Sequence, residues 1–297
     1  MRPRKPVPNK IACVSTTASI LGENPLWDPE AGRLFWIDCM GRKLFRHDRA
    51  GARQEEWALP RAPGSFALRT GGGMLMAYRR GLALIEPGTA MLDDIATPGI
   101  DFTKEVFNDG KCDRRGRFWT GTMDRNTTEP VGALYRLDPD RLVHRMDDGI
   151  TLSNGIAWSP DDRTMYYCDS HPGLVWAYDY DIDAGTIGNR RVFVDFTGRA
   201  GRPDGCTVDS EGGLWVAEVD AGRVVRFDPS GREMLAVPLP VSLPTSVMFG
   251  GPDLRTLFVT SMRYGLSAEQ LAREPRAGCV FAVDAGLAGL PPMRFAG

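Results

Sequence analysis

The sequence is poor in the residues from which many hydrolytic and metal sites are built. Its only histidines, His47, His144 and His171, are scattered over 297 residues, too few and too far apart to suggest a zinc site. The six cysteines stand singly, without a CxxC pair, which favours reduced thiols over disulfides and a cytoplasmic protein. No GxSxG motif is present, so a serine hydrolase has little support.

Long apolar runs are also missing. No stretch approaches the roughly 18 consecutive apolar residues of a membrane span, so we expect no membrane association. Residues 1–10 are basic and rich in proline, but residues 11–21 are interrupted by serine, threonine and alanine, unlike a secretory signal. We expect residues 1–10 to be a flexible segment that precedes the folded domain.

The chain has no excess of charge of either sign. Its 36 basic and 38 acidic side chains are well mixed and give a net charge of -2, which argues against nucleic acid or acidic lipid as a partner. Apolar residues make up 42% and charged residues 25%, as in an ordinary globular protein with a sizeable core. Helix signals are scarce, and residues 267–273 are the one plausible short helix, with Ser267 as its cap and Pro275 as its stop.

What the sequence does contain is a repeat. Six pairs of alternating apolar segments follow one another, and their members are residues 32–38 and 42–48, 73–78 and 81–86, 116–121 and 132–138, 163–168 and 174–179, 213–218 and 222–228, and 255–260 and 278–284. Successive pairs lie about 40 to 50 residues apart, the period of four-stranded propeller blades. The repeat predicts an all-β fold, a six-bladed β-propeller that occupies residues 11–297 as one domain.

Two further features bear on this prediction. A solenoid of stacked hairpins is the structural alternative, but the chain ends do not resemble polar capping repeats. Residues 12–19 precede the first complete repeat and can supply a strand to the last blade. We therefore expect the N-terminus to close the ring and remove its open edge.

Polar motifs recur at one phase of the repeat, just before the expected innermost strand of a blade. They are Gly22-Glu23-Asn24-Pro25, Phe107-Asn108-Asp109-Gly110, Ser153-Asn154-Gly155, Pro203-Asp204-Gly205 and Pro244-Thr245-Ser246. Asn-Gly and Asp-Gly pairs are common turn formers, and each motif alone is best read that way. In a propeller, however, this phase faces the central channel, so side chains from different blades can converge there.

Convergence would bring together carboxylates from Glu23 and Asp204 and amides from Asn108 and Asn154. Oxygen ligands with two negative charges suit a hard divalent ion such as Ca²⁺, Mg²⁺ or Mn²⁺. The shared phase of four motifs therefore favours a metal site over four unrelated turns.

The same motifs resemble the senescence marker protein, regucalcin and gluconolactonase family of six-bladed propeller lactonases. The resemblance rests on residues 22–27, 107–111 with 121–123, 153–155, 189–191 and 203–205, and on the C-terminal stretch 274–297. It implies that Glu23, Asn154 and Asp204 bind one divalent metal ion, with Ca²⁺, Zn²⁺, Mn²⁺, Fe²⁺ and Mg²⁺ all open, and that Asn108 contacts the sugar.

The implied activity is hydrolysis of a sugar lactone to its aldonic acid, with the cation as Lewis acid and Asp204 also as general base. This chain has Val106 where regucalcin-type members have arginine, and Asn126 near the position of an acidic residue. We expect the loop from Asp124 to Val131 to take over part of substrate binding, with Asp124 and Asn126 as its contacts. Gluconolactone, xylonolactone, arabinolactone and galactonolactone remain open as substrates.

Two other functions remain open at this point. One is a non-catalytic cation-binding propeller with a regulatory role, which would bind metal without turnover. The other is an organophosphate or aryl ester hydrolase that uses the same cation. We expect the protein to be a monomer.

Overall fold

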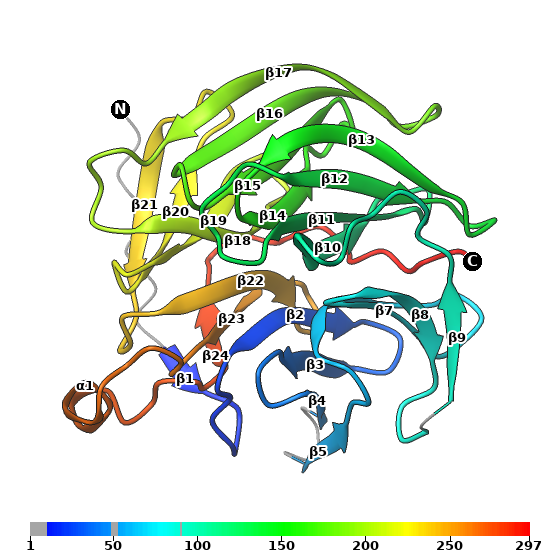
Figure 1. The fold of residues 1–297 in the computed structure, drawn as a ribbon. Helices are drawn as coiled ribbons and strands as arrows, with labels where there is room; N and C mark the ends of the chain where they lie inside the picture. The colour runs from blue at the N-terminus through cyan, green and yellow to red at the C-terminus, as the bar shows by residue number, and fades with distance from the viewer. Residues whose placement is uncertain (1–10, 49–52, 90) are drawn as a thin grey trace.

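The computed structural model describes residues 11–48, 53–89 and 91–297, and these form six four-stranded antiparallel sheets arranged around a centre (Figure 1). The expected flexible segment 1–10 lies outside the described residues. The all-β prediction and the count of six blades are confirmed. No helix in the described part of the chain is long and apolar enough to cross a membrane.

The blades follow one another along the chain, each running from an inner to an outer strand. Blade 1 holds β2 (Gly22–Asp28), β3 (Arg33–Asp38), β4 (Lys43–Asp48) and β5 (Arg53–Ala58). Blade 2 holds β6 (Pro63–Leu68), β7 (Met74–Tyr78), β8 (Gly81–Ile85) and β9 (Leu92–Ile95). Blade 3 holds β10 (Glu105–Cys112), β11 (Phe118–Asp124), β12 (Gly132–Leu137) and β13 (Val143–Ile150). Blade 4 holds β14 (Ser153–Trp158), β15 (Thr164–Asp169), β16 (Leu174–Asp181) and β17 (Thr186–Asp195). Blade 5 holds β18 (Arg202–Val208), β19 (Leu214–Val219), β20 (Arg223–Phe227) and β21 (Glu233–Pro238).

The last blade is completed by the start of the chain. Its sheet has the order β1-β24-β23-β22, made of β22 (Pro244–Gly250), β23 (Thr256–Ser261), β24 (Phe281–Asp284) and β1 (Ile11–Cys13). Strand β1 pairs antiparallel with β24, with Ile11 opposite Val283. The predicted ring closure by the N-terminal strand is therefore confirmed, and it covers the edge that β24 would otherwise expose.

The repeated segments of the sequence are the two middle strands of each blade, and the inner one of each pair is buried along nearly its whole length. Their large aromatic residues fill the space between neighbouring blades, and Trp36, Trp119 and Trp215 are completely buried. Two of these tryptophans are fixed by a carboxylate six residues earlier: Trp119 Nε1 donates to Asp113 Oδ2 at 2.9 Å, and Trp215 Nε1 to Asp209 Oδ2 at 2.7 Å. The spacing Asp-x-x-Gly-x-x-Trp is thus a packing motif.

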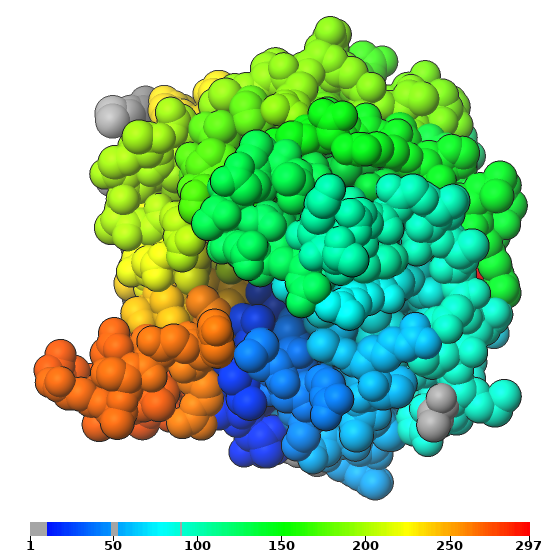
Figure 2. Space-filling model, in the orientation of Figure 1, coloured from blue at the N-terminus to red at the C-terminus, as the bar shows by residue number. Residues whose placement is uncertain are grey.

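The short helix predicted over residues 267–273 is present as α1 (Ala268–Arg273) between β23 and β24. Ser267 caps it, and Gln270 completes a capping box with Ser267. The segment with α1 projects from the body of the propeller (Figure 2).

Every innermost strand carries an irregularity at the same place. In β2, β6, β10, β14, β18 and β22 the pairing with the second strand shifts register close to the strand's start. A bulge leaves residues without a partner in the ladder and redirects their side chains. These six bulges position the candidate site.

Candidate metal and substrate site

The four predicted polar residues lie at these bulges. Glu23 and Asn154 adjoin or occupy the shifts in β2 and β14, Asn108 lies between the paired residues Phe107 and Gly110 of β10, and Asp204 lies between Pro203 and Cys206 of β18. The sequence pattern predicted these residues just before the innermost strands. They lie inside those strands, because each strand begins before its run of apolar residues. The polar motifs recur at one phase of the repeat because each innermost strand has a bulge at that place.

The glycines that follow the polar residues do not form turns. Gly155 and Gly205 lie within β14 and β18, and neither has a positive φ. A Cβ on Gly155 would lie 2.6 Å from the backbone O of Asp204, and one on Gly205 would lie 2.2 Å from Ser246 Oγ. Glycine is required here because the inner strands of neighbouring blades approach closely around the channel.

A chain of hydrogen bonds joins the two amides. Asn108 Nδ2 donates to Asn154 Oδ1 at 2.9 Å and to the backbone O of Ser153 at 2.7 Å. Asn154 Nδ2 donates in turn to Ser170 Oγ at 2.7 Å, and Ser170 Oγ donates to the backbone O of Pro203. The network fixes both amide planes and leaves Asn154 Oδ1 one further lone pair.

The two predicted carboxylates lie close enough to repel each other. Burial and then the charge of Asp204 raise the pKa of Glu23 well above its usual range. Burial and then the charge of Asp109 do the same to the pKa of Asp204. Asp204 is 7% exposed, yet its Oδ1 has no hydrogen-bond donor among the described residues.

Asp109 is a third buried carboxylate of the channel, and it was not among the predicted site residues. Its Oδ1 accepts from the backbone N of Gly110 at 2.7 Å, and burial raises its pKa. The neighbouring Lys111 donates from Nζ to the backbone O of Cys206 at 2.7 Å and lowers the pKa of Asp109. The available signal was its place inside the Phe107–Gly110 motif.

The two residues predicted to contact substrate from the loop after β11 have different surroundings. Asp124 Oδ2 accepts from the backbone N of Thr128 at 2.9 Å and of Glu129 at 3.1 Å, and these bonds lower its pKa. Its carboxylate therefore holds the loop in shape. Asn126 is exposed on the loop surface.

A guanidinium reaches this region from another blade. Val106 is buried in β10, and Arg79, directly after β7, donates from Nη1 to Asn108 Oδ1 at 2.9 Å. The sequence indicated no role for Arg79, because it follows an apolar strand and has no motif around it. Only the packing of blade 2 against blade 3 shows the contact.

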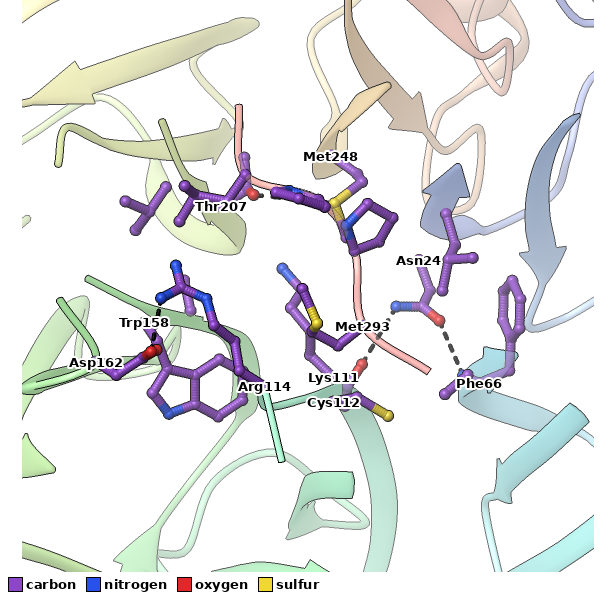
Figure 3. Close-up of a pocket in the computed structure, with 18 residues that line it drawn as sticks. Asn24, Phe66, Lys111, Cys112, Arg114, Trp158, Asp162, Thr207, Met248 and Met293 are labelled. Atoms are coloured by element: carbon purple, nitrogen blue, oxygen red, sulfur yellow. Dashed lines mark hydrogen bonds and ion pairs between the residues drawn. The ribbon is translucent and has the colours of Figure 1, made fainter. Parts of the chain in front are cut away.

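A cavity of about 60 Å³ is lined by residues of the inner strands, among them Asn24, Phe66 and Lys111 (Figure 3). Asn24 bridges its wall: its Oδ1 accepts from the backbone N of Phe66 at 2.9 Å, and its Nδ2 donates to the backbone O of Gly110 at 3.4 Å. The C-terminal segment 290–293 lines the same cavity. Asn24 is thus committed to joining blades 1, 2 and 3 and is not a free ligand.

The donor set fits a divalent cation. Two buried carboxylates repel each other, one carboxylate oxygen has no partner, and an oriented amide oxygen adjoins them. A cation would relieve the repulsion and complete the unsatisfied oxygen. Among the described residues no group of three or more His, Cys, Asp or Glu side chains is arranged to hold a metal, so an amide would have to complete the set.

Comparisons with known proteins cover almost the whole chain. Residues 21–263 match the family model described as SMP-30/Gluconolactonase/LRE-like region. The chain is 39% identical to regucalcin of Gallus gallus over 97% of this chain and 99% of that protein. It is 38% identical to 6-deoxy-6-sulfogluconolactonase of Pseudomonas putida over the same shares of the two chains. The solved structure of a calcium-binding protein, regucalcin, from Agrobacterium tumefaciens superposes with a TM-score of 0.89 at 30% identity, covering 95% of this chain and 96% of that one.

Proposed function

The chain belongs to the SMP-30/gluconolactonase/LRE-like family, and on this premise we propose that it hydrolyses a sugar lactone to the corresponding aldonic acid. The proposal is supported by the relative from Pseudomonas putida, which is named a 6-deoxy-6-sulfogluconolactonase. The observation that carries it is the partnerless Oδ1 of Asp204 beside the buried carboxylate of Glu23. A buried carboxylate oxygen without a donor is costly to the fold and is expected where it has a chemical role.

Glu23, Asn154 and Asp204 would hold a divalent cation at this place. The calcium-binding regucalcin from Agrobacterium tumefaciens supports a cation of this kind. An all-oxygen set accepts Ca²⁺, Mg²⁺ and Mn²⁺, with Zn²⁺ and Fe²⁺ as further candidates. When bound, the cation supplies positive charge that polarises the lactone carbonyl.

The side chains of the site then have distinct tasks. Asn108, fixed by Asn154 and Ser153, presents a rigid amide to the sugar hydroxyls. The Asp204 carboxylate accepts a proton from water as the water oxygen bonds to the carbonyl carbon. The ring C–O bond breaks, and the same proton passes to the departing ring oxygen, so that one lactone and one water give one hydroxy acid.

Turnover of a panel of aldonolactones in a pH-stat tests the proposal. We expect hydrolysis of at least one lactone, loss of activity with a chelator and recovery with one of the five divalent ions. Asp204→Ala and Asn154→Ala should each lose activity, because each removes an oxygen of the set. Full activity in both variants would show that the site is wrong.

The panel also separates the other functions. Metal binding by calorimetry without turnover of any lactone would indicate a regulatory cation-binding propeller, which the regucalcin relatives make the main alternative. Faster turnover of aryl esters or organophosphates than of lactones would indicate the third possibility.

A further inference from the structure

Arg79 is a partly buried cation without a counter-ion. Its Nη1 donates to the neutral amide oxygen of Asn108 at 2.9 Å and lies 3.9 Å from Met123 Sδ. Among the described residues, no carboxylate forms an ion pair with it. Burial lowers the pKa of its guanidinium, as expected for a charge that has left water without being paired.

A second arginine, Arg125, follows the strand that carries Met123. Arg125 follows the last residue of β11, and its backbone N donates to the backbone O of Lys104 at 3.0 Å, which prolongs the pairing of β10 with β11. It comes two residues after Met123, the spacing at which strand side chains share a face. Because Arg79 Nη1 lies 3.9 Å from Met123 Sδ, this spacing directs Arg125 to the side of the strand that Arg79 contacts. The charge of Arg125 is also among the smaller causes that lower the pKa of Arg79, after burial.

Arg125 is exposed, and within the described ranges its side chain has no ion pair either. Its loop is held by the carboxylate of Asp124, whose Oδ2 accepts from the backbone N of Thr128 and Glu129, and no ion pair of Asp124 is found among the described residues. Two arginines whose side chains are largely buried elsewhere in the molecule are paired: Arg117 with Asp113 at 2.7 Å and Arg226 with Asp209 at 2.6 Å. The lack of a counter-ion for Arg79 and Arg125 among the described residues is consequently a local feature of the site.

Two neighbouring guanidinium groups that repel each other form a receptor for an oxyanion, because each can donate two parallel hydrogen bonds to it. Asn108 links Arg79 directly to Asn154, so an anion at Arg79 would lie one side chain away from the proposed cation ligands. We infer that Arg79 and Arg125 bind an anionic substituent of the lactone, a carboxylate, phosphate or sulfonate group remote from the reacting carbonyl. The inference rests on the proposed function and narrows its substrate class to anionic sugar lactones.

The test compares lactones that differ only in the substituent: D-glucono-1,5-lactone and its analogues with phosphate, sulfonate or carboxylate at carbon 6. Values of kcat/KM are measured for the wild type, Arg79→Gln, Arg125→Gln and the double variant. Arg79→Lys, which keeps the charge, and Arg80→Gln serve as controls; Arg80 is an exposed neighbour that lies outside the site. Thermal unfolding checks that each variant is folded.

We expect the wild type to prefer at least one anionic lactone over the neutral one by about tenfold or more, as charge-assisted bonds to an arginine pair allow. The double variant should reduce this preference by at least about tenfold, Arg79→Lys should restore part of it, and Arg80→Gln should leave it unchanged. No preference in the wild type would overturn the inference. An equal loss on neutral and anionic lactones would also overturn it and would make Arg79 a positioning residue for Asn108.

Binding of the ring-opened acids separates this inference from the proposed function. If no lactone is hydrolysed, the proposed function fails, and calorimetry with D-gluconate and 6-phospho-D-gluconate then decides the inference alone. Tighter binding of the phosphorylated acid that is lost in the double variant would support an oxyanion site. Equal binding of the two acids would overturn it.

Discussion

Asp204 and Asp209 lie five residues apart in blade 5, and both are buried, but their surroundings are opposite. Asp209 is fully buried and accepts from Trp215 Nε1 at 2.7 Å, Arg226 Nε at 2.6 Å and Gly213 N at 2.9 Å. Asp204 is 7% exposed, and its Oδ1 has no donor in the described structure. A buried carboxylate is tolerated when its oxygens are paired and is costly when they are not.

The difference separates a carboxylate that holds the fold from one that we assign to chemistry. The partners of Asp209 recur in blade 3, where Asp113 accepts from Trp119, Arg117 and Tyr180. No such donors surround Asp204; its neighbours include two further carboxylates, Glu23 and Asp109. The same residue type at similar depth therefore stabilises one part of a blade and destabilises another.

Replacing Asp204 should give the largest effect on turnover. We expect Asp204→Asn to lower kcat/KM by about a thousandfold, or roughly 4 kcal/mol, because a cation ligand and the proton acceptor are both lost. Its free energy of unfolding in the presence of a chelator should not fall, because a buried unpaired charge is removed. Urea unfolding and lactone kinetics measure the two quantities. A clear loss of stability would mean that Asp204 has structural partners like those of Asp209.

Replacing Asp209 should reverse this pattern. We expect Asp209→Asn to lower the free energy of unfolding by about 3 to 5 kcal/mol, because Arg226 would lose its buried partner. Turnover per folded molecule should stay near the wild-type value. Urea unfolding, with kinetics at a temperature where the variant is folded, provides the comparison. A variant that is stable but inactive would contradict the assignment.

Stabilisation by the cation should depend on Asp204 and not on Asp209. At a concentration about 100 times its Kd, a bound ion should raise the free energy of unfolding by about 2.7 kcal/mol. Asp204→Asn should largely abolish this increase, whereas Asp209→Asn should retain it on its lower baseline. Thermal shifts with and without chelator give the measurement. An undiminished shift in Asp204→Asn would place the cation elsewhere.

The smallest expected effect is a pH dependence in the stability of the loop that Asp124 holds. Hydrogen bonds, first of all from the backbone N of Thr128, lower its folded-state pKa below 3.8. A lowered pKa gives stability that is present above the unfolded pKa and is lost as the pH falls through the folded one. We therefore expect faster amide exchange at Thr128 and Glu129 relative to other loops below about pH 4. Asp124→Asn should lose this pH dependence, and an unchanged profile would contradict the role of Asp124 in holding the loop.

Much of the fold could be predicted because it depends on short apolar segments that recur along the sequence. Each blade needs two largely apolar middle strands, and this requirement repeats with a measurable period. The N-terminal strand was also predictable, since a propeller with an open edge exposes unpaired backbone groups. The bulges were visible only as a repeated phase of polar motifs, because a register shift depends on the partner strand.

The candidate site was predictable in composition but not in geometry. Glu23, Asn108, Asn154 and Asp204 all come from one phase of the repeat, although their functions as ligands and substrate contacts stay predictions. The approach of Arg79 to Asn108 could not be anticipated, because it joins two blades across 29 residues without a shared motif. The glycines were likewise ambiguous, since Asn-Gly is compatible both with a turn and with close packing.

By itself the sequence determined the number of blades, their strands and the set of polar side chains directed to the channel, because these follow from periodic burial. Only the tertiary structure decided which carboxylates are satisfied. Asp209 pairs with Trp215, six residues later, and a fixed spacing of this kind is visible in the sequence. Asp204 is distinguished by an Oδ1 that has no donor among the described residues, and its carboxylate neighbours Glu23 and Asp109 come from other blades.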